Sequence, residues 1–259
     1  MIQKIKSQFS YKLRQRIKYK VRTIIGYFFW YDLNRIAQIH RTDKYMIGRH
    51  TYTPIYMEHF KKFQFRRNVI LEIGVGGYNS PISGGNSLRM WKNYFPFSKI
   101  FGIDVFDKTF HEERRIQIFQ GSQENQEFLF EVIKKTKNPH IIIDDGSHIN
   151  SHVISSFSIL FPLLRDGGIY VVEDTQTSYW NNMGGDCENL NNKQTTMGFF
   201  KSLADGLNHA EFIIPGYYPT YLDLNIKSIH FYHNMIFIYK GPNTEKSNIV
   251  IDNYKFIYD

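Results

Sequence analysis

The chain has 259 residues, of which 42% are hydrophobic and 17% aromatic, so it is long enough to bury one sizeable core and carry extensions. Its single cysteine, Cys187, excludes an internal disulfide, and no apolar stretch approaches the roughly 20 residues that span a membrane. The formal net charge of +8 is concentrated at the start, because eight Lys or Arg residues and no acid precede Asp32.

Residues 1–40 are predicted to form a separate basic helical extension, and residues 41–259 the main domain. Apolar residues recur at helical spacing from Ile2 through Ile5 and Phe9 to Ile24, with bases between them. One interpretation is a helix docked on the domain or on another subunit. The other is a cationic helix that lies on an anionic membrane surface through residues 1–31.

The basic N-terminal segment and the cysteine content also bear on binding partners and on cellular location. Nucleic acid is not expected as a partner, because no basic and aromatic platform motif accompanies the helix. We expect a homo-oligomer. The cysteine usage fits a reducing compartment, so we expect a cytoplasmic protein, with the inner face of the membrane as the alternative location.

From residue 69 onward, apolar strands alternate with helical segments, which is typical of an α/β fold with a parallel sheet. After a first strand that begins at Val69, strands are predicted at 99–104, 116–120, 140–145 and 169–174. Helices are predicted at 87–94, 127–135, 149–164 and 197–210, and a long loop at 175–195. Two last strands, 226–233 and 235–239, are predicted to pair in antiparallel fashion.

The first strand breaks into a glycine-rich turn. Gly74 and Gly76 would let the backbone turn sharply and let a ligand approach it closely. Glu72 lies inside the apolar strand, so it needs a partner when it is buried. Asp104, at the end of the second strand, could hold a ribose, as in nucleotide-binding α/β folds. The alternative is a strand–turn–helix unit that binds no ligand.

Acids also end the fourth and fifth predicted strands. Asp145, Glu173 and Asp174 can converge at the edge of the sheet where open α/β folds bind ligands. Converging carboxylates repel unless a cation joins them, and hard oxygen ligands suit Mg²⁺, with Mn²⁺ as the alternative. His148 could take a proton beside that ion. The alternatives are a helix cap at Asp145, ion pairs with Lys or Arg, and a structural histidine.

Aromatic residues lie on both sides of these motifs. Tyr45 belongs to a polar and aromatic cluster before the first strand, which either covers a ligand or packs in the core. Tyr179 and Trp180, in the long loop, offer faces on which a sugar ring can stack. The alternative for this segment is a flexible surface loop.

These motifs together resemble those of a known family. The chain resembles the class I S-adenosylmethionine-dependent methyltransferases. More narrowly, it is similar to the metal-dependent sugar O-methyltransferases of macrolide biosynthesis, the mycinamicin and macrocin O-methyltransferase family. The stretches that carry the resemblance are Thr42-Asp43-Lys44-Tyr45, His50 to Tyr56, Leu71 to Tyr78, Gly84 to Trp91, Phe119-Gln120-Gly121, Ile143 to His148, and Glu173 to Trp180.

The resemblance covers about residues 41–241 and implies a Rossmann-like class I methyltransferase sheet, parallel with an antiparallel closing strand. It implies that Asp145, Glu173 and Asp174 hold Mg²⁺ and that His148 is the general base, with Asp145 beside it. It also implies an S-adenosylmethionine site, formed by Tyr45, Glu72, Gly74, Gly76, Ser87, Asp104, Ser122, Gln123 and Asp144. The chain departs from the family at Ser122, where the family usually has an acid near the adenine.

The sequence therefore predicts an enzyme, an S-adenosylmethionine- and Mg²⁺-dependent O-methyltransferase. Its acceptor would be a hydroxyl of a sugar-containing small molecule or a glycan. One alternative is a metal-dependent methyltransferase of a catechol-like or antibiotic small molecule. A further alternative is a non-catalytic, cofactor-binding, membrane-associated assembly factor. The presence of Asp145, His148, Glu173 and Asp174 together argues against this last one, because a binding module does not need all four.

Overall fold

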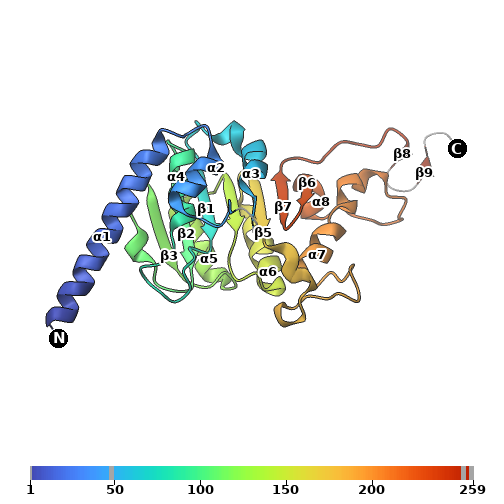
Figure 1. Ribbon diagram of the computed structural model, residues 1–259. Coiled ribbons are helices and arrows are strands. Elements are labelled where there is room, and N and C mark those ends of the chain that lie inside the picture. The colour runs from blue at the N-terminus through green and yellow to red at the C-terminus, as the bar shows by residue number, and fades with distance from the viewer. Residues whose placement is uncertain (1, 47–49, 252–254, 257–259) are drawn as a thin grey trace. The chain divides into compact units, whose positions relative to one another are not determined.

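The structure is a computed structural model that describes residues 2–46, 50–251 and 255–256, with side chains described for 11–46 and 50–250 (Figure 1). The expected apolar positions Ile2, Ile5 and Phe9 lie outside the described side chains. The chain divides into two compact units, unit 1 (Met1–Ser122) and unit 2 (Gln123–Asp259). Among the described residues, no helix combines the length and the apolar character needed to cross a bilayer.

Unit 1 contains three parallel strands, β1 (Val69–Ile73), β2 (Lys99–Asp104) and β3 (Ile116–Gln120), in the order β3-β2-β1. The crossover helix α4 (Asn86–Tyr94) connects β1 to β2. These elements lie where the sequence predicts them. Strand β1 is a short apolar segment around Glu72 and is almost wholly buried, as expected of a strand inside a parallel sheet.

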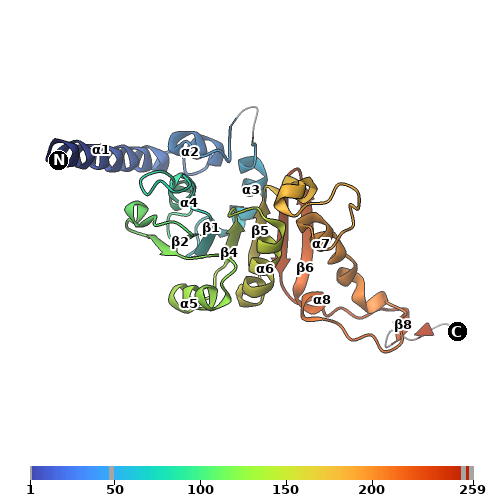
Figure 2. The same ribbon diagram turned by 90° about the horizontal axis from the view of Figure 1, so that it is seen from below.

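Five further helical elements belong to unit 1: α1 (Ile2–Tyr27), α2 (Leu33–His40), α3 (Thr53–Phe60) and the 3₁₀ turns η1 (Lys61–Phe63) and η2 (Thr109–His111). Helices α1, α2 and α4 lie on the same face of the strands (Figure 2). Trp91 of α4 anchors an aromatic core, with ring centroids 4.9 Å from Tyr56 and 5.8 Å from Phe60. Asp32 caps α2 by accepting a hydrogen bond from the Arg35 N–H.

The C-terminal part of α1 is attached to α2 and α4. Asn93 of α4 donates a hydrogen bond to the Thr23 carbonyl at 3.0 Å, and its side-chain oxygen lies 2.5 Å from His40 Nε2. The N-terminal part of α1 extends beyond the rest of unit 1 (Figure 1). The boundary predicted at residue 40, between a basic helical extension and the main domain, stays a prediction.

Unit 2 contains β4 (Ile141–Asp144), β5 (Ile169–Glu173), β6 (Ile226–Tyr232) and β7 (Met235–Lys240) in the order β4-β5-β7-β6. Strands β4 and β5 are parallel, whereas β7 is antiparallel to both β5 and β6. The predicted antiparallel closing pair is therefore confirmed. Two short strands near the C-terminus, β8 (Val250–Ile251) and β9 (Lys255–Phe256), pair in antiparallel fashion.

The helices of unit 2 are α5 (Gln126–Thr136), α6 (Asn150–Leu160), α7 (Thr196–Ser202) and α8 (Tyr221–Asn225). Helices α5 and α6 lie on the same side of β4 and β5 (Figure 2). Phe157 of α6 forms the centre of an aromatic core, with ring centroids 5.1 Å from Tyr170 and 4.8 Å from Phe200.

Three predictions about the helical segments of unit 2 need correction. The helix predicted at 149–164 ends at Leu160 and continues as the 3₁₀ turn η3 (Phe161–Leu163), because Pro162 cannot donate a backbone hydrogen bond. The helix predicted at 197–210 ends at Ser202. It is followed by the 3₁₀ segment η6 (Asp205–Glu211), in which Asn208 departs from helical geometry. The loop predicted at 175–195 contains two 3₁₀ turns, η4 (Thr175–Tyr179) and η5 (Asn181–Met183).

Candidate functional site

The glycine turn after β1 is closed by backbone hydrogen bonds. Gly74 and Gly76 have φ values of 93° and 76°, in the left-handed region that favours glycine. Asp104 lies beside the turn, as the sequence predicts, and its carboxylate accepts hydrogen bonds from Val75 N at 3.0 Å and Phe106 N at 2.9 Å. A Cβ at Gly76 would meet no described heavy atom within 4 Å, so a ligand has room to approach there.

The buried acid of β1 has the partners that its burial requires. Glu72 is fully buried, its Oε1 lies 3.3 Å from Lys44 Nζ, and its Oε2 accepts a hydrogen bond from Ser87 Oγ at 2.9 Å. The sequence motifs include Lys44, in Thr42-Asp43-Lys44-Tyr45, but they do not predict that it pairs with Glu72. Its neighbour Tyr45 is half-buried and forms an isolated bridge with Thr51.

At the end of β4, Asp144 turns its carboxylate into unit 2. It accepts hydrogen bonds from Ser156 Oγ at 2.5 Å, Tyr170 OH at 3.2 Å and Gln123 Nε2 at 3.2 Å. Burial raises the pKa of Asp144, and the hydrogen bonds from Ser156 and Tyr170 oppose that rise. Gln123 in turn accepts a hydrogen bond from Ser147 N at 2.9 Å. Gln123 therefore links the Asp144 side chain to the backbone of Ser147, in the segment that follows β4.

Sequence reasoning missed Ser156 and Tyr170, because neither residue belongs to a motif. The sequence indicated only that Asp144, an acid at the end of an apolar strand, needs hydrogen-bond donors when it is buried. It did not indicate which residues supply them. The remaining predicted contact, Ser122, is half-buried at the end of unit 1.

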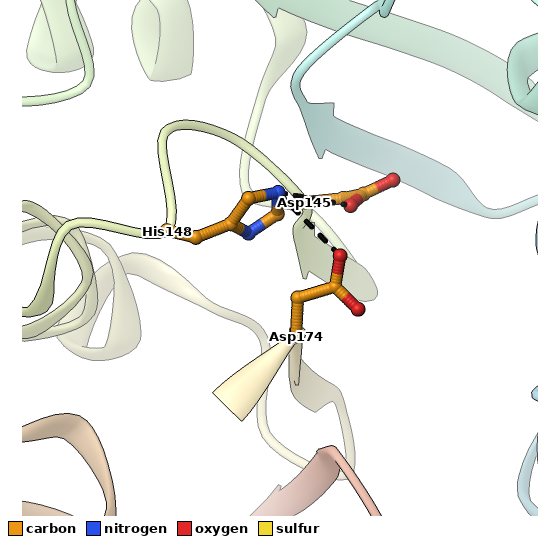
Figure 3. Close-up of side chains that lie close together, drawn as sticks. All are labelled: Asp145, His148 and Asp174. Carbon is orange, nitrogen blue, oxygen red and sulfur yellow. Dashed lines mark ion pairs between the residues drawn. The ribbon is translucent and has the colours of Figure 1, made fainter. Parts of the chain in front are cut away.

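Asp145, His148 and Asp174 lie close together at the ends of β4 and β5 (Figure 3), and with Glu173, the last residue of β5, they are here called the acidic site. His148 Nε2 lies 3.8 Å from Asp145 Oδ1 and 3.7 Å from Asp174 Oδ2. One atom from each of these three residues lies within 4.8 Å of the others. Asp145 and Glu173 also offer carboxylate oxygens within 4.8 Å of each other. The structure thus places Asp145, His148 and Asp174 close together, with Glu173 near Asp145.

The backbone at the acidic site is unusual. His148 and Asp174 have φ values of 56° and 55°, in the left-handed region that residues other than glycine rarely adopt. His148 lies in the loop before α6, which begins at Asn150. The N-cap of α6 is Ile149, so the alternative of Asp145 as the cap of that helix is wrong.

The donor set of the acidic site fits a hard divalent cation. Carboxylates this close repel one another, and a cation that binds several of them removes the repulsion. Asp145, His148 and Asp174 are half-buried, so the site keeps one side open to solvent and to a further ligand. Oxygen ligands with open positions are those that Mg²⁺ prefers.

Asn150, the first residue of α6, holds the segment that follows β5. Its buried side chain donates hydrogen bonds to the carbonyls of Thr177 at 3.0 Å and Met183 at 2.8 Å, and accepts one from Thr196 N at 2.6 Å. The side chains of Tyr179 and Trp180 between these attachments are exposed. The segment therefore presents two aromatic faces from a backbone that is hydrogen-bonded at both ends.

Comparison with known proteins identifies the fold. No protein-family model matches the chain. The MycE methyltransferase from the mycinamycin biosynthetic pathway, solved in complex with Mg and SAH, matches with a TM-score of 0.80 at 44% identity, covering 83% of this chain and 56% of that chain. The same methyltransferase solved with Mg, SAH and mycinamycin VI matches with a TM-score of 0.79. The chain therefore has the fold of a class I S-adenosylmethionine-dependent methyltransferase.

Curated relatives narrow the assignment. Mycinamicin VI 2''-O-methyltransferase of Micromonospora griseorubida is 44% identical over 215 residues, 83% of this chain and 54% of the relative. Demethylmacrocin O-methyltransferase of Streptomyces fradiae is 43% identical over 217 residues, again 83% of this chain and 54% of the relative. The chain is thus a homologue of the macrolide sugar O-methyltransferases, as the sequence motifs predict. It spans about half the length of the curated relatives it matches.

Proposed function

We propose that the protein is an S-adenosylmethionine- and Mg²⁺-dependent O-methyltransferase that methylates a hydroxyl of a sugar or glycosylated acceptor. The observation that carries the proposal is the acidic site, where His148 Nε2 lies 3.7–3.8 Å from two carboxylates at neighbouring strand ends. The 44% identity to a methyltransferase solved with Mg and SAH supports the same pair of cofactors for this chain.

Each residue of the acidic site has a role in this proposal. Bound Mg²⁺ would lower the pKa of a coordinated hydroxyl, and bound S-adenosylmethionine would supply the methyl group. Asp145, Glu173 and Asp174 would hold the ion with their carboxylates. His148 accepts the hydroxyl proton at Nε2, because this ring nitrogen is on the side of the carboxylates. The left-handed backbone of His148 and Asp174 is strained, and it keeps both side chains directed at the same point.

The residues around the glycine turn are proposed to bind S-adenosylmethionine. Gly74 and Gly76 allow close approach of the ligand, and Asp104 accepts hydrogen bonds from the ribose hydroxyls with its remaining lone pairs. The Glu72 carboxylate, held by Lys44 and Ser87, keeps the turn in place. Tyr45 and Ser122, also in unit 1, are the further contacts proposed for this cofactor, while Gln123 and Asp144 of unit 2 stay predictions from the sequence.

The proposed acceptor is a sugar with neighbouring hydroxyls. One further relative, 42% identical, is named for methylation at the 2' position of a rhamnosyl tetracenomycin. Exposed Tyr179 and Trp180 would stack on the sugar ring, as aromatic side chains do on apolar ring faces. The homo-oligomer stays a prediction from the sequence.

Methyl transfer from labelled S-adenosylmethionine tests the proposal directly. Mycinamicin VI, simple L-rhamnosides and catechol serve as acceptors, each with Mg²⁺ and with excess EDTA. We expect a mass gain of one methyl group on a sugar hydroxyl, only when Mg²⁺ is present. Methylation of catechol and of none of the sugars would reject the sugar acceptor, and full activity in EDTA would reject the metal.

A further inference from the structure

Helix α1 has one face that is covered by the rest of unit 1. Tyr19 is buried on this face, where the Arg89 guanidinium lies 3.9 Å from the centroid of its ring. Thr23, one turn further along, is also buried and accepts the hydrogen bond from Asn93 through its carbonyl. A Cβ at Gly26 would lie 2.4 Å from the Asn93 side chain, so close packing continues to the last turn of α1.

The opposite face of α1 carries apolar side chains that nothing described in unit 1 covers. Four of them form a stripe, here called the α1 stripe, and they are between 48% and 60% exposed: Leu13, Ile17, Val21 and Ile24. At 3.6 residues per turn, the stripe is centred roughly half a turn around the helix from Tyr19. It continues past the helix end into Phe28, which is 74% exposed. Contacts within unit 1 therefore do not explain these side chains.

Bases lie on both sides of the α1 stripe. By the same helical geometry, Lys20 lies along one edge, and Arg14 and Lys18 lie along the other. All three are exposed. No acid stands in the sequence before Asp32, so nothing on α1 itself neutralises them. The α1 stripe is thus an apolar surface with a positive border.

We propose that this face of α1 lies on an anionic lipid bilayer, with the α1 stripe among the acyl chains and the bases among the headgroups. Trp30 and Tyr31 are exposed just beyond the helix, and amphipathic rings of this kind prefer the membrane interface. Because the N-terminal part of α1 extends beyond the rest of unit 1, a flat surface can reach it (Figure 1).

Two other occupants of this face explain the observations less well. A second copy of the chain packed stripe to stripe would bring two sets of bases together with no acid between them, which costs free energy. A nucleic acid would neutralise the bases but would leave four apolar side chains in water. An anionic bilayer satisfies both features at once. The proposal is independent of the acceptor and of the metal.

Co-sedimentation of the full chain with vesicles tests the proposal. One set of vesicles contains phosphatidylcholine and phosphatidylglycerol, and the other contains phosphatidylcholine alone. The stripe variant is Ile17→Gln with Val21→Gln, and the charge variant is Lys18→Gln with Lys20→Gln. The matched control is Ile213→Gln with Ile214→Gln, a comparably exposed apolar pair in unit 2. Thermal unfolding with S-adenosylhomocysteine checks that every variant is folded.

We expect wild type and control to bind the anionic vesicles, and the stripe variant to bind them about tenfold more weakly or worse. The charge variant should lose the preference for phosphatidylglycerol, and added salt should weaken wild-type binding. Equal vesicle binding by wild type and stripe variant would overturn the proposal. A wild-type oligomer that the stripe variant dissociates, without vesicle binding by either, would overturn it in favour of a second copy. If wild type bound DNA instead of vesicles, and only the charge variant lost that binding, the proposal would be overturned in favour of nucleic acid.

Discussion

His148 is the residue on which the proposed chemistry depends most. Its Nε2 lies close to Asp145 and Asp174, yet its side chain is not needed for the hydrogen bonds that close the glycine turn or hold Asp144. His148→Ala should therefore lower kcat by about 10²- to 10⁴-fold, the usual contribution of a general base. Binding of S-adenosylhomocysteine, measured by calorimetry, should stay within about twofold of wild type.

A second histidine, His233, provides the matched control for the His148 substitution. His233 is exposed in the turn between β6 and β7, and His233→Ala should leave kcat unchanged. A near-normal kcat for His148→Ala would assign the base to another group. Loss of cofactor binding in the same variant would instead mean that the left-handed turn at His148 is needed for the fold of this region.

At the scale of elements, the segment between β5 and α7 depends on one side chain of α6. Asn150→Ala removes three hydrogen bonds inside unit 2 and leaves buried backbone groups without their partner. The free energy of unfolding should fall by about 2 to 4 kcal/mol. Because Tyr179 and Trp180 lie between the attachment points, the KM for the acceptor should rise more than the KM for the cofactor.

Urea unfolding and steady-state kinetics on Asn150→Ala measure the two effects separately. Asn189→Ala, in the exposed part of the same segment, should change the free energy of unfolding by less than about 0.5 kcal/mol. If both KM values in Asn150→Ala matched wild type, the segment would lie outside the acceptor site.

The attachment of α1 and α2 to α4 is predicted to weaken in acid. Burial lowers the pKa of His40 to about 4, even though its hydrogen bond to Asn93 opposes this, so the folded chain holds the ring neutral. Burial likewise lowers the pKa of His111 to about 4. In the unfolded chain these rings take up protons near pH 6.5, so the free energy of unfolding should fall as pH drops from about 6.5 to 4.

The variant His40→Gln isolates this effect, because glutamine can donate a hydrogen bond to Asn93 but does not titrate. Wild type should lose up to about 3 kcal/mol more than His40→Gln between pH 7 and pH 4. Thermal unfolding across that range provides the measurement. Parallel stability profiles for the two proteins would show that His40 is already charged in the folded state.

At the scale of the whole molecule, cofactor and metal are predicted to act separately. S-adenosylhomocysteine at 100 times its Kd should stabilise the chain by about 2.7 kcal/mol, with or without EDTA. In Asp145→Asn that stabilisation should remain, while added Mg²⁺ should no longer restore activity after chelation. Glu127→Gln, an exposed acid on α5, is the matched control and should respond to Mg²⁺ as wild type does. A wild-type response in Asp145→Asn would remove this residue from the metal site.

Much of the fold and of the acidic site was predictable because the signals are local. The strands at 99–104 and 116–120 are short segments rich in Ile and Phe, and the structure has them at the same residues. Asp145, Glu173 and Asp174 meet because the carboxyl ends of adjacent parallel strands lie at one edge of a sheet. The helix ends in unit 2 were harder, since Pro162 and Asn208 change helix geometry without removing the apolar pattern.

By itself, the sequence determined the order of strands and helices, the acids at the strand ends, the glycine turn and the resemblance to sugar O-methyltransferases. Only the tertiary structure decided which groups satisfy the buried charges, namely Lys44 and Ser87 for Glu72 and Ser156 and Tyr170 for Asp144. It alone also decided which face of α1 is covered and which is exposed. The physical reason is that periodicity describes one element at a time, whereas these contacts depend on which surfaces meet when the chain folds.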